Sequence, residues 1–237
     1  MDNKRIMTDP ALVQSIADAL GYLKQEGHEI PLDIQLKARQ IGAIKAGGDI
    51  SSIRATYHDE ITSALISYLE GGSVTAPRNQ FRRAAVEALG DAFDIGYADG
   101  GAELPIDGEA LSWLNARIEQ EMGHIGTLFE QAKELRKEAD TDLLGFASDR
   151  ADGYTGTLDE LYTVGVMYAD ARQILTWSLG GTEKHCPTCS KLDGERHRAE
   201  WFIARDYIPR KPGASLDCGG YNCDCSLTNA AGEEITI

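Results

Sequence analysis

With 237 residues, 42% of them hydrophobic and 26% charged, the chain is long enough to bury a core of its own and has the composition of an ordinary globular protein. Its 38 acidic and 23 basic side chains give a net charge of −15, which repels a phosphate backbone and argues against nucleic-acid binding by the whole surface. The first residues lack the apolar core of a signal peptide, and no stretch approaches the roughly 20 apolar residues of a membrane-spanning helix, so we expect a cytosolic protein that makes no membrane contact.

Apolar residues recur at spacings of three and four through the first 140 residues, and glycine pairs interrupt them. This pattern predicts successive helices over 10–27, 31–46, 51–71 and 77–100, and from Asp107 over about 28 residues. The fourth carries a stripe of small residues at 84–92 that allows another helix to approach closely. The last would pack as one arm of a long helical hairpin or in a helical bundle. We therefore expect residues 1–140 to form a helical domain, and the protein to be mainly α.

The pattern changes twice in the second half of the chain. Four aspartates and three glycines at 140–157 predict a connection over 141–157 with about one turn of helix. Helical spacing then returns at 158–181 and predicts a last helix, which ends at a glycine pair and leads into a C-terminal module. Residues 182–237 contain all the cysteines and form this Cys-rich module.

The five cysteines, Cys186, Cys189, Cys218, Cys223 and Cys225, lie within 40 residues as C-x2-C followed by C-x4-C-x-C. A C-x2-C turn directs both sulfurs to one point, and a second pair returned by a β-hairpin or loop completes a tetrahedral zinc site. The two glycines of "CGGYNC" can adopt positive φ where the second half must curl. So few aliphatic residues cannot stabilise a module by burial alone, whereas zinc supplies about 10 kcal/mol or more in isolated zinc peptides. We therefore predict a small zinc-stapled β-hairpin/loop module.

Five cysteines exceed the four positions of a tetrahedral site. Cys186 and Cys189 are the firmest pair and Cys223 is next, followed by Cys218 and Cys225, because C-x-C sulfurs in an extended segment point to opposite faces. His185 is a further candidate, although a histidine directly beside such a cysteine is more often outside the metal shell. A short hairpin is expected around the turn at 193–194. Two alternatives stay open, namely disulfides formed after cell lysis and a fold that buries free thiols.

Catalytic interpretations have less support, so we expect no enzyme activity. A thioredoxin-like pair needs its C-x2-C at a helix N-terminus after a strand, within a βαβ unit, whereas this one is predicted to follow a helix. Catalytic zinc needs an open coordination position, and the cluster offers a surplus of thiolates instead. A zinc-stabilised nuclease or toxin domain would have to use His185 and His197.

Residues 195–211 form the one locally basic and aromatic stretch. They would make a weak DNA contact by base stacking and phosphate binding. The alternative is that the aromatic side chains cover the metal site while the arginines stay solvated.

The C-terminal pattern resembles the signature of minor head proteins of tailed bacteriophages, the head-morphogenesis family, over about 45 residues. The matching residues are Cys186, Cys189, Leu192, Asp193, Gly194, Cys223, Cys225 and Leu227. Where many members place a histidine or proline shortly before the final C-x-C, this chain has Cys218 and two glycines. The resemblance implies a structural component of the virion head that assembles in the host cytoplasm against a portal, connector or major capsid protein. The alternative is a zinc-ribbon-type adaptor or regulator that binds protein or DNA.

Overall fold

The computed structural model describes residues 10–25, 34, 38, 49–104, 106, 108–138, 142–181, 184–221 and 223–235. It is mainly helical, with a small antiparallel sheet and a cluster of cysteines near the C-terminal end, which confirms the predicted fold class. The elements are α2 (Pro10–Gln25), α4 (Ile50–Leu69), α5 (Thr75–Asp99), α6 (Gly108–Leu135), α7 (Leu143–Thr155), α8 (Thr157–Ala169), β1 (Ile174–Ser178), α9 (Pro187–Leu192), β2 (Arg196–Arg198), α10 (Ala199–Arg205) and β3 (Ser226–Thr228).

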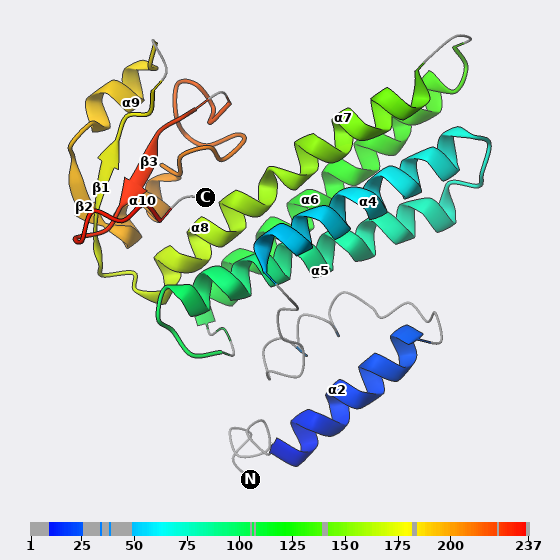
Figure 1. Cartoon of the computed structure of the whole chain (residues 1–237), viewed down its shortest axis with the longest axis horizontal. Coiled ribbons are helices and arrows are strands. Elements are labelled where there is room, and N and C mark those ends of the chain that lie inside the picture. The colour runs from blue at the N-terminus through cyan, green and yellow to red at the C-terminus, as the bar shows by residue number, and fades with distance from the viewer. Residues whose placement is uncertain are drawn as a thin grey trace.

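Four helical rods pack side by side along most of the molecule, and Figure 1 shows α7 and α8 following one another as one of them. The others are α4, α5 and α6, and α2 lies apart in this view. Of the two arrangements predicted for the long helix at 108–135, the structure has the bundle. The four helices predicted at 10–27, 51–71, 77–100 and from 107 are confirmed to within a few residues at their ends. Most of the predicted 31–46 helix lies outside the described residues.

The bundle is held by an aromatic and aliphatic core. Phe81 has no exposed surface, and its ring centroid lies 4.9 Å from that of Tyr154 and 6.3 Å from that of Phe129. The small-residue stripe of α5 is buried as predicted, and the close approach extends to Gly96, where a Cβ atom would lie 2.0 Å from the carbonyl oxygen of Tyr162. The backbones of α5 and α8 therefore touch. None of the described helices is long and apolar enough to cross a bilayer.

The prediction of a connection over 141–157 is wrong, because most of this segment is helix α7. Asp142 caps the helix, with its Oδ1 accepting a 2.8 Å hydrogen bond from the N–H of Gly145. The buried side of α7 consists of Ala147, Ala151 and Thr155, at a spacing of four. These side chains are too small to register as an apolar stripe. Gly156 has helical angles (φ −60°, ψ −24°) and joins α7 to α8 with little interruption.

The predicted helix at 158–181 is correct only as far as Ala169, because β1 occupies its last third. Leu175 and Leu179 are four residues apart, a spacing that fits one face of a helix and equally one face of a strand. In the structure Leu175 and Trp177 are both fully buried, and Ile174, Thr176 and Ser178 are more exposed, which is the alternation of a strand.

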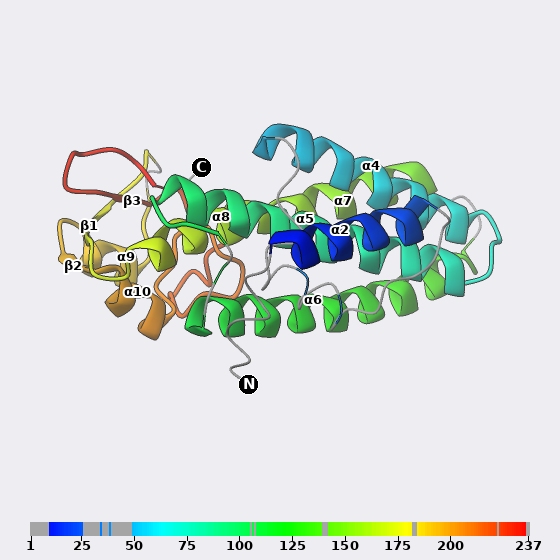
Figure 2. The same ribbon diagram turned by 90° about the horizontal axis from the view of Figure 1, so that it is seen from below.

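The C-terminal module lies at one end of the bundle in both views (Figures 1 and 2). Its sheet has the order β2–β1–β3, with both neighbours antiparallel to β1 and with Leu175 opposite His197 and Trp177 opposite Leu227. The hairpin expected around 193–194 differs from this arrangement. The turn is present, with Gly194 at φ 75°, but β2 pairs with β1 from before the first cysteine, and α9 lies between the two strands.

Candidate metal centre

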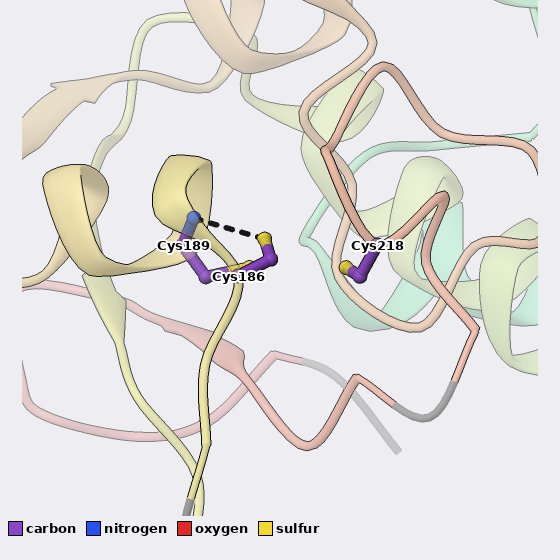
Figure 3. Close-up of side chains that lie close together, drawn as sticks. All are labelled: Cys186, Cys189 and Cys218. Atoms are coloured by element: carbon purple, nitrogen blue, oxygen red, sulfur yellow. Dashed lines mark hydrogen bonds between the residues drawn. The ribbon is translucent and has the colours of Figure 1, made fainter.

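The first cysteine pair lies at the start of the short helix α9. Cys186 caps the helix, and its sulfur accepts a 3.3 Å hydrogen bond from the N–H of Cys189 (Figure 3). Pro187 occupies the first turn, where its missing N–H is not needed. Cys189 is 2% exposed. The C-x2-C segment therefore curls as predicted for a metal-binding turn.

A carboxylate fixes the second segment against the first. Asp217 accepts hydrogen bonds from the hydroxyl (2.6 Å) and the N–H (2.8 Å) of Thr188, which lies between the first two cysteines. These bonds lower the pKa of Asp217. The next residue, Cys218, faces Cys186 from a separate loop in Figure 3, and its backbone N–H helps to lower the pKa of the Cys186 thiol.

Cys218 opens a second turn of the same kind. The backbone N–H of Gly220 favours the thiolate of Cys218, and Gly219 and Gly220 have φ values of 60° and 74°. The positive φ predicted for these glycines is thus observed. A Cβ atom at Gly220 would lie 1.8 Å from the carbonyl oxygen of Lys211, so this position also requires glycine for space.

The C-x-C segment reaches the cluster by crossing the residues after β1. The backbone N–H of Gly180 favours the thiolate of Cys225, and the N–H of Gly181 donates to the Asp224 carboxylate at 2.9 Å. A Cβ atom at Gly180 would lie 1.9 Å from the carbonyl oxygen of Asp224. The glycine pair that was predicted only to end a helix therefore lets two backbones meet beside Cys225.

The five predicted ligands come together in two groups that share Cys189. Cys186, Cys189 and Cys218 form one, and Cys189, Cys223 and Cys225 form the other, with the sulfurs of each group within 4.8 Å of one another. The expectation that the C-x-C sulfurs face apart is wrong, because residues 223–225 precede β3 and lack the regular pleat of a strand. Among the described residues, neither group includes His185.

The electrostatics of the cluster favour a bound cation. Burial raises the pKa of the Cys189, Cys218 and Cys225 thiols, and neighbouring cysteines add to the effect. Burial acts in the same direction on Cys186, but the backbone N–H groups and the thiols of Cys189 and Cys218 together outweigh it and lower the pKa of that thiol. Several thiolates this close together repel one another unless a metal neutralises them. A set of sulfur ligands with backbone N–H donors suits a soft or borderline ion such as Zn²⁺.

The structure contradicts one argument against a redox pair, which was that a helix precedes the C-x2-C segment. Cys186 follows a β-strand and caps a helix, whereas the sequence predicted a helix before it. The surroundings still differ from a thioredoxin-like site, because β1 is antiparallel to both of its partners and three further cysteines lie next to the pair.

The basic aromatic stretch at 195–211 folds as β2, α10 and the loop after it. The His197 ring stacks on Trp201 with a centroid distance of 3.7 Å and an interplanar angle of 10°, and the Arg205 guanidinium lies 4.2 Å from the centroid of the same ring. Two groups this close cannot share one face, so both faces of Trp201 are covered. Phe202 is fully buried in the core that also contains Cys189 and Cys225. The aromatic residues thus pack over the module rather than offering a free surface for bases.

Comparisons of the chain with family models, curated proteins and solved structures give no match.

Proposed function

We propose that this protein is a non-enzymatic structural component of a tailed-phage head, whose C-terminal module is stapled by one zinc ion. The observation that carries the zinc proposal is the convergence of five sulfurs from three separate segments of the chain, with backbone N–H groups directed at three of them. Such donors stabilise metal-bound thiolates as well as free ones.

We assign the four positions to Cys186, Cys189, Cys218 and Cys225, with Cys223 as the surplus thiol. Backbone N–H groups favour the thiolates of Cys186, Cys218 and Cys225, and Cys189 belongs to both groups. Cys225 is 1% exposed, whereas Cys223 is half-buried. With four thiolates the ion has no position left for water or substrate, which favours a structural zinc over a catalytic one.

The residues that resemble the phage head-morphogenesis signature have structural positions in this module. Leu192 and Leu227 are buried in its core. Gly194 has a positive φ, and its N–H donates to the carbonyl oxygen of Trp177 at 2.9 Å. The Asp193 carboxylate accepts from the N–H of Leu179 at 3.4 Å. The signature residues therefore stabilise the fold of the module. This supports a module shared with the head-morphogenesis family and, through it, the proposal of a head protein.

In this proposal the helical bundle supplies the surface that binds a portal, connector or major capsid protein, and the zinc keeps the tip of the molecule rigid. Mass spectrometry of purified phage particles tests it directly, with peptide intensities calibrated against the major capsid protein. We expect the chain at a fixed copy number in intact particles. Its presence in the lysate and absence from washed particles would overturn the head assignment, and metal-dependent cleavage of DNA or RNA by the purified chain would overturn the non-enzymatic one.

A further inference from the structure

The helical bundle contains a buried charge cluster that the module completes. The Arg117 guanidinium of α6 donates to both carboxylate oxygens of Glu160 on α8 (Nε to Oε1 3.0 Å, Nη2 to Oε2 3.2 Å) and to Glu121 (2.8 Å). The three side chains are between 0% and 7% exposed. Two carboxylates thus face one guanidinium in the bundle interior, and burial raises the pKa of Glu160.

The second positive charge comes from the module. Lys211 lies in the loop 206–221, which links α10 to the second cysteine turn, and its Nζ is 3.8 Å from Oε1 of Glu160. The same ammonium group is 2.5 Å from the carboxylate of Asp206, at the start of the loop. Lys211 is only 14% exposed. The charge of Lys211 favours the ionised form of Glu160 against the effect of burial, so the buried carboxylate would be more costly without it.

The same loop is attached to the bundle core and to the cysteine cluster. Ile208 is fully buried in the core of the bundle, although it belongs in sequence to the module. At its other end, Gly220 packs against the backbone of Lys211, and its N–H favours the thiolate of Cys218. A continuous set of contacts therefore runs from a cysteine ligand through Gly220 and Lys211 to Glu160.

The loop also closes one side of a cleft of about 370 Å³. Pro212, Gly213 and Tyr221 of the loop line it on one side, and Arg117, Glu121 and Tyr154 line it on the other. Movement of the loop would open this cleft and admit water to the Arg117 cluster.

We propose that the metal at the cysteine cluster fixes loop 206–221 on the helical bundle, so that losing the metal withdraws Lys211 from Glu160 and loosens the contact of α6 with α8. The inference rests on the zinc site proposed above. The cysteine cluster would then control the rigidity of the bundle end nearest the module as well as that of the module itself.

Hydrogen exchange of the full chain, followed by mass spectrometry with zinc bound and after removal by a chelator, tests the inference. We expect peptides containing Arg117 and Glu160 to exchange on the order of tenfold faster without zinc, within the usual range of coupling between two sites. Peptides from the middle of α4, around Ile61, should not change. Because the wild-type chain supplies this comparison, it does not depend on the folding of a variant.

Substitution of the linking residue refines the test. Lys211→Met should keep the zinc content of the wild type but exchange fast around Glu160 with or without zinc, and Lys211→Arg should behave like the wild type. Lys133→Met, which removes an exposed ion pair with Glu130, is the matched control and should have no effect on exchange at Glu160. If zinc binds but its removal leaves exchange around Arg117 and Glu160 unchanged, the inference is wrong and the zinc site stands. If the chain takes up no zinc, both are wrong.

Discussion

The helical bundle and the cysteine module differ in how much apolar surface their elements can bury. The bundle buries complete side chains such as Ile61, Phe81 and Leu114 between helices of 13 to 28 residues. The module has strands of three to five residues, helices of six and seven, and a core in which Trp177 and Phe202 lie next to cysteines. The bundle has the long helices that apolar burial requires, whereas the module has only short elements, and we therefore propose that a metal stabilises it.

Removal of the metal should give the largest difference in stability between the module and the bundle. Since a structural zinc contributes on the order of 10 kcal/mol to folding, a chelator should unfold the module and leave the bundle helical. We expect proteases to cut within 174–235 only after chelation, and the fluorescence of the buried Trp177 to shift toward that of a solvated indole. Resistance of 174–235 to proteases in a metal-free sample would show that burial alone supports the module.

Single cysteine substitutions should reduce zinc binding to different extents. Cys189→Ser should abolish stoichiometric zinc binding, because Cys189 belongs to both sulfur groups. Cys223→Ser is the matched control, and should retain the metal because the other four sulfurs form the proposed site. Zinc content and thermal unfolding of the two variants check this. Loss of zinc in Cys223→Ser with retention in Cys225→Ser would reverse our assignment of the surplus thiol.

A core substitution should weaken the bundle without touching the metal. Phe81→Ala removes a fully buried ring that contacts Tyr154 and Phe129, and should lower the free energy of unfolding by about 3–5 kcal/mol. The zinc content should stay that of the wild type. Denaturant unfolding of the zinc-loaded chain measures the loss, and zinc release that moves to lower denaturant together with the weakened bundle would contradict the division into two parts.

The smallest effect is expected at the residue that positions the ligands. Asp217→Ala removes both hydrogen bonds to Thr188, and should weaken zinc affinity on the order of tenfold while all five cysteines remain. Competition with a chromophoric chelator measures the affinity. Glu200→Ala, at an exposed ion pair on α10, should leave it unchanged. An affinity equal to that of the wild type in Asp217→Ala would mean that Thr188 and Asp217 do not order the cluster.

Local patterns predict the parts of this fold that local interactions decide. The long helices follow from apolar spacing, and the gathering of the sulfurs follows from the clustering of cysteines in the sequence. The pattern fails at 141–157, where the buried face is made of Ala147 and Ala151, and at 174–178, where the spacing of Leu175 and Leu179 fits a helix and a strand alike. The contact of Gly180 with Asp224 and the pairing of Arg117, Glu160 and Lys211 join segments far apart in the chain, so no local signal marks them.

The central claim is that the cysteine module is built around one metal ion, and the zinc content of the purified chain tests it most directly. Elemental analysis of protein purified without added zinc, with Cys189→Ser prepared in parallel, should give about one equivalent per wild-type chain and none per variant chain. A wild-type chain free of zinc and other metals, with 174–235 still folded, would contradict the account.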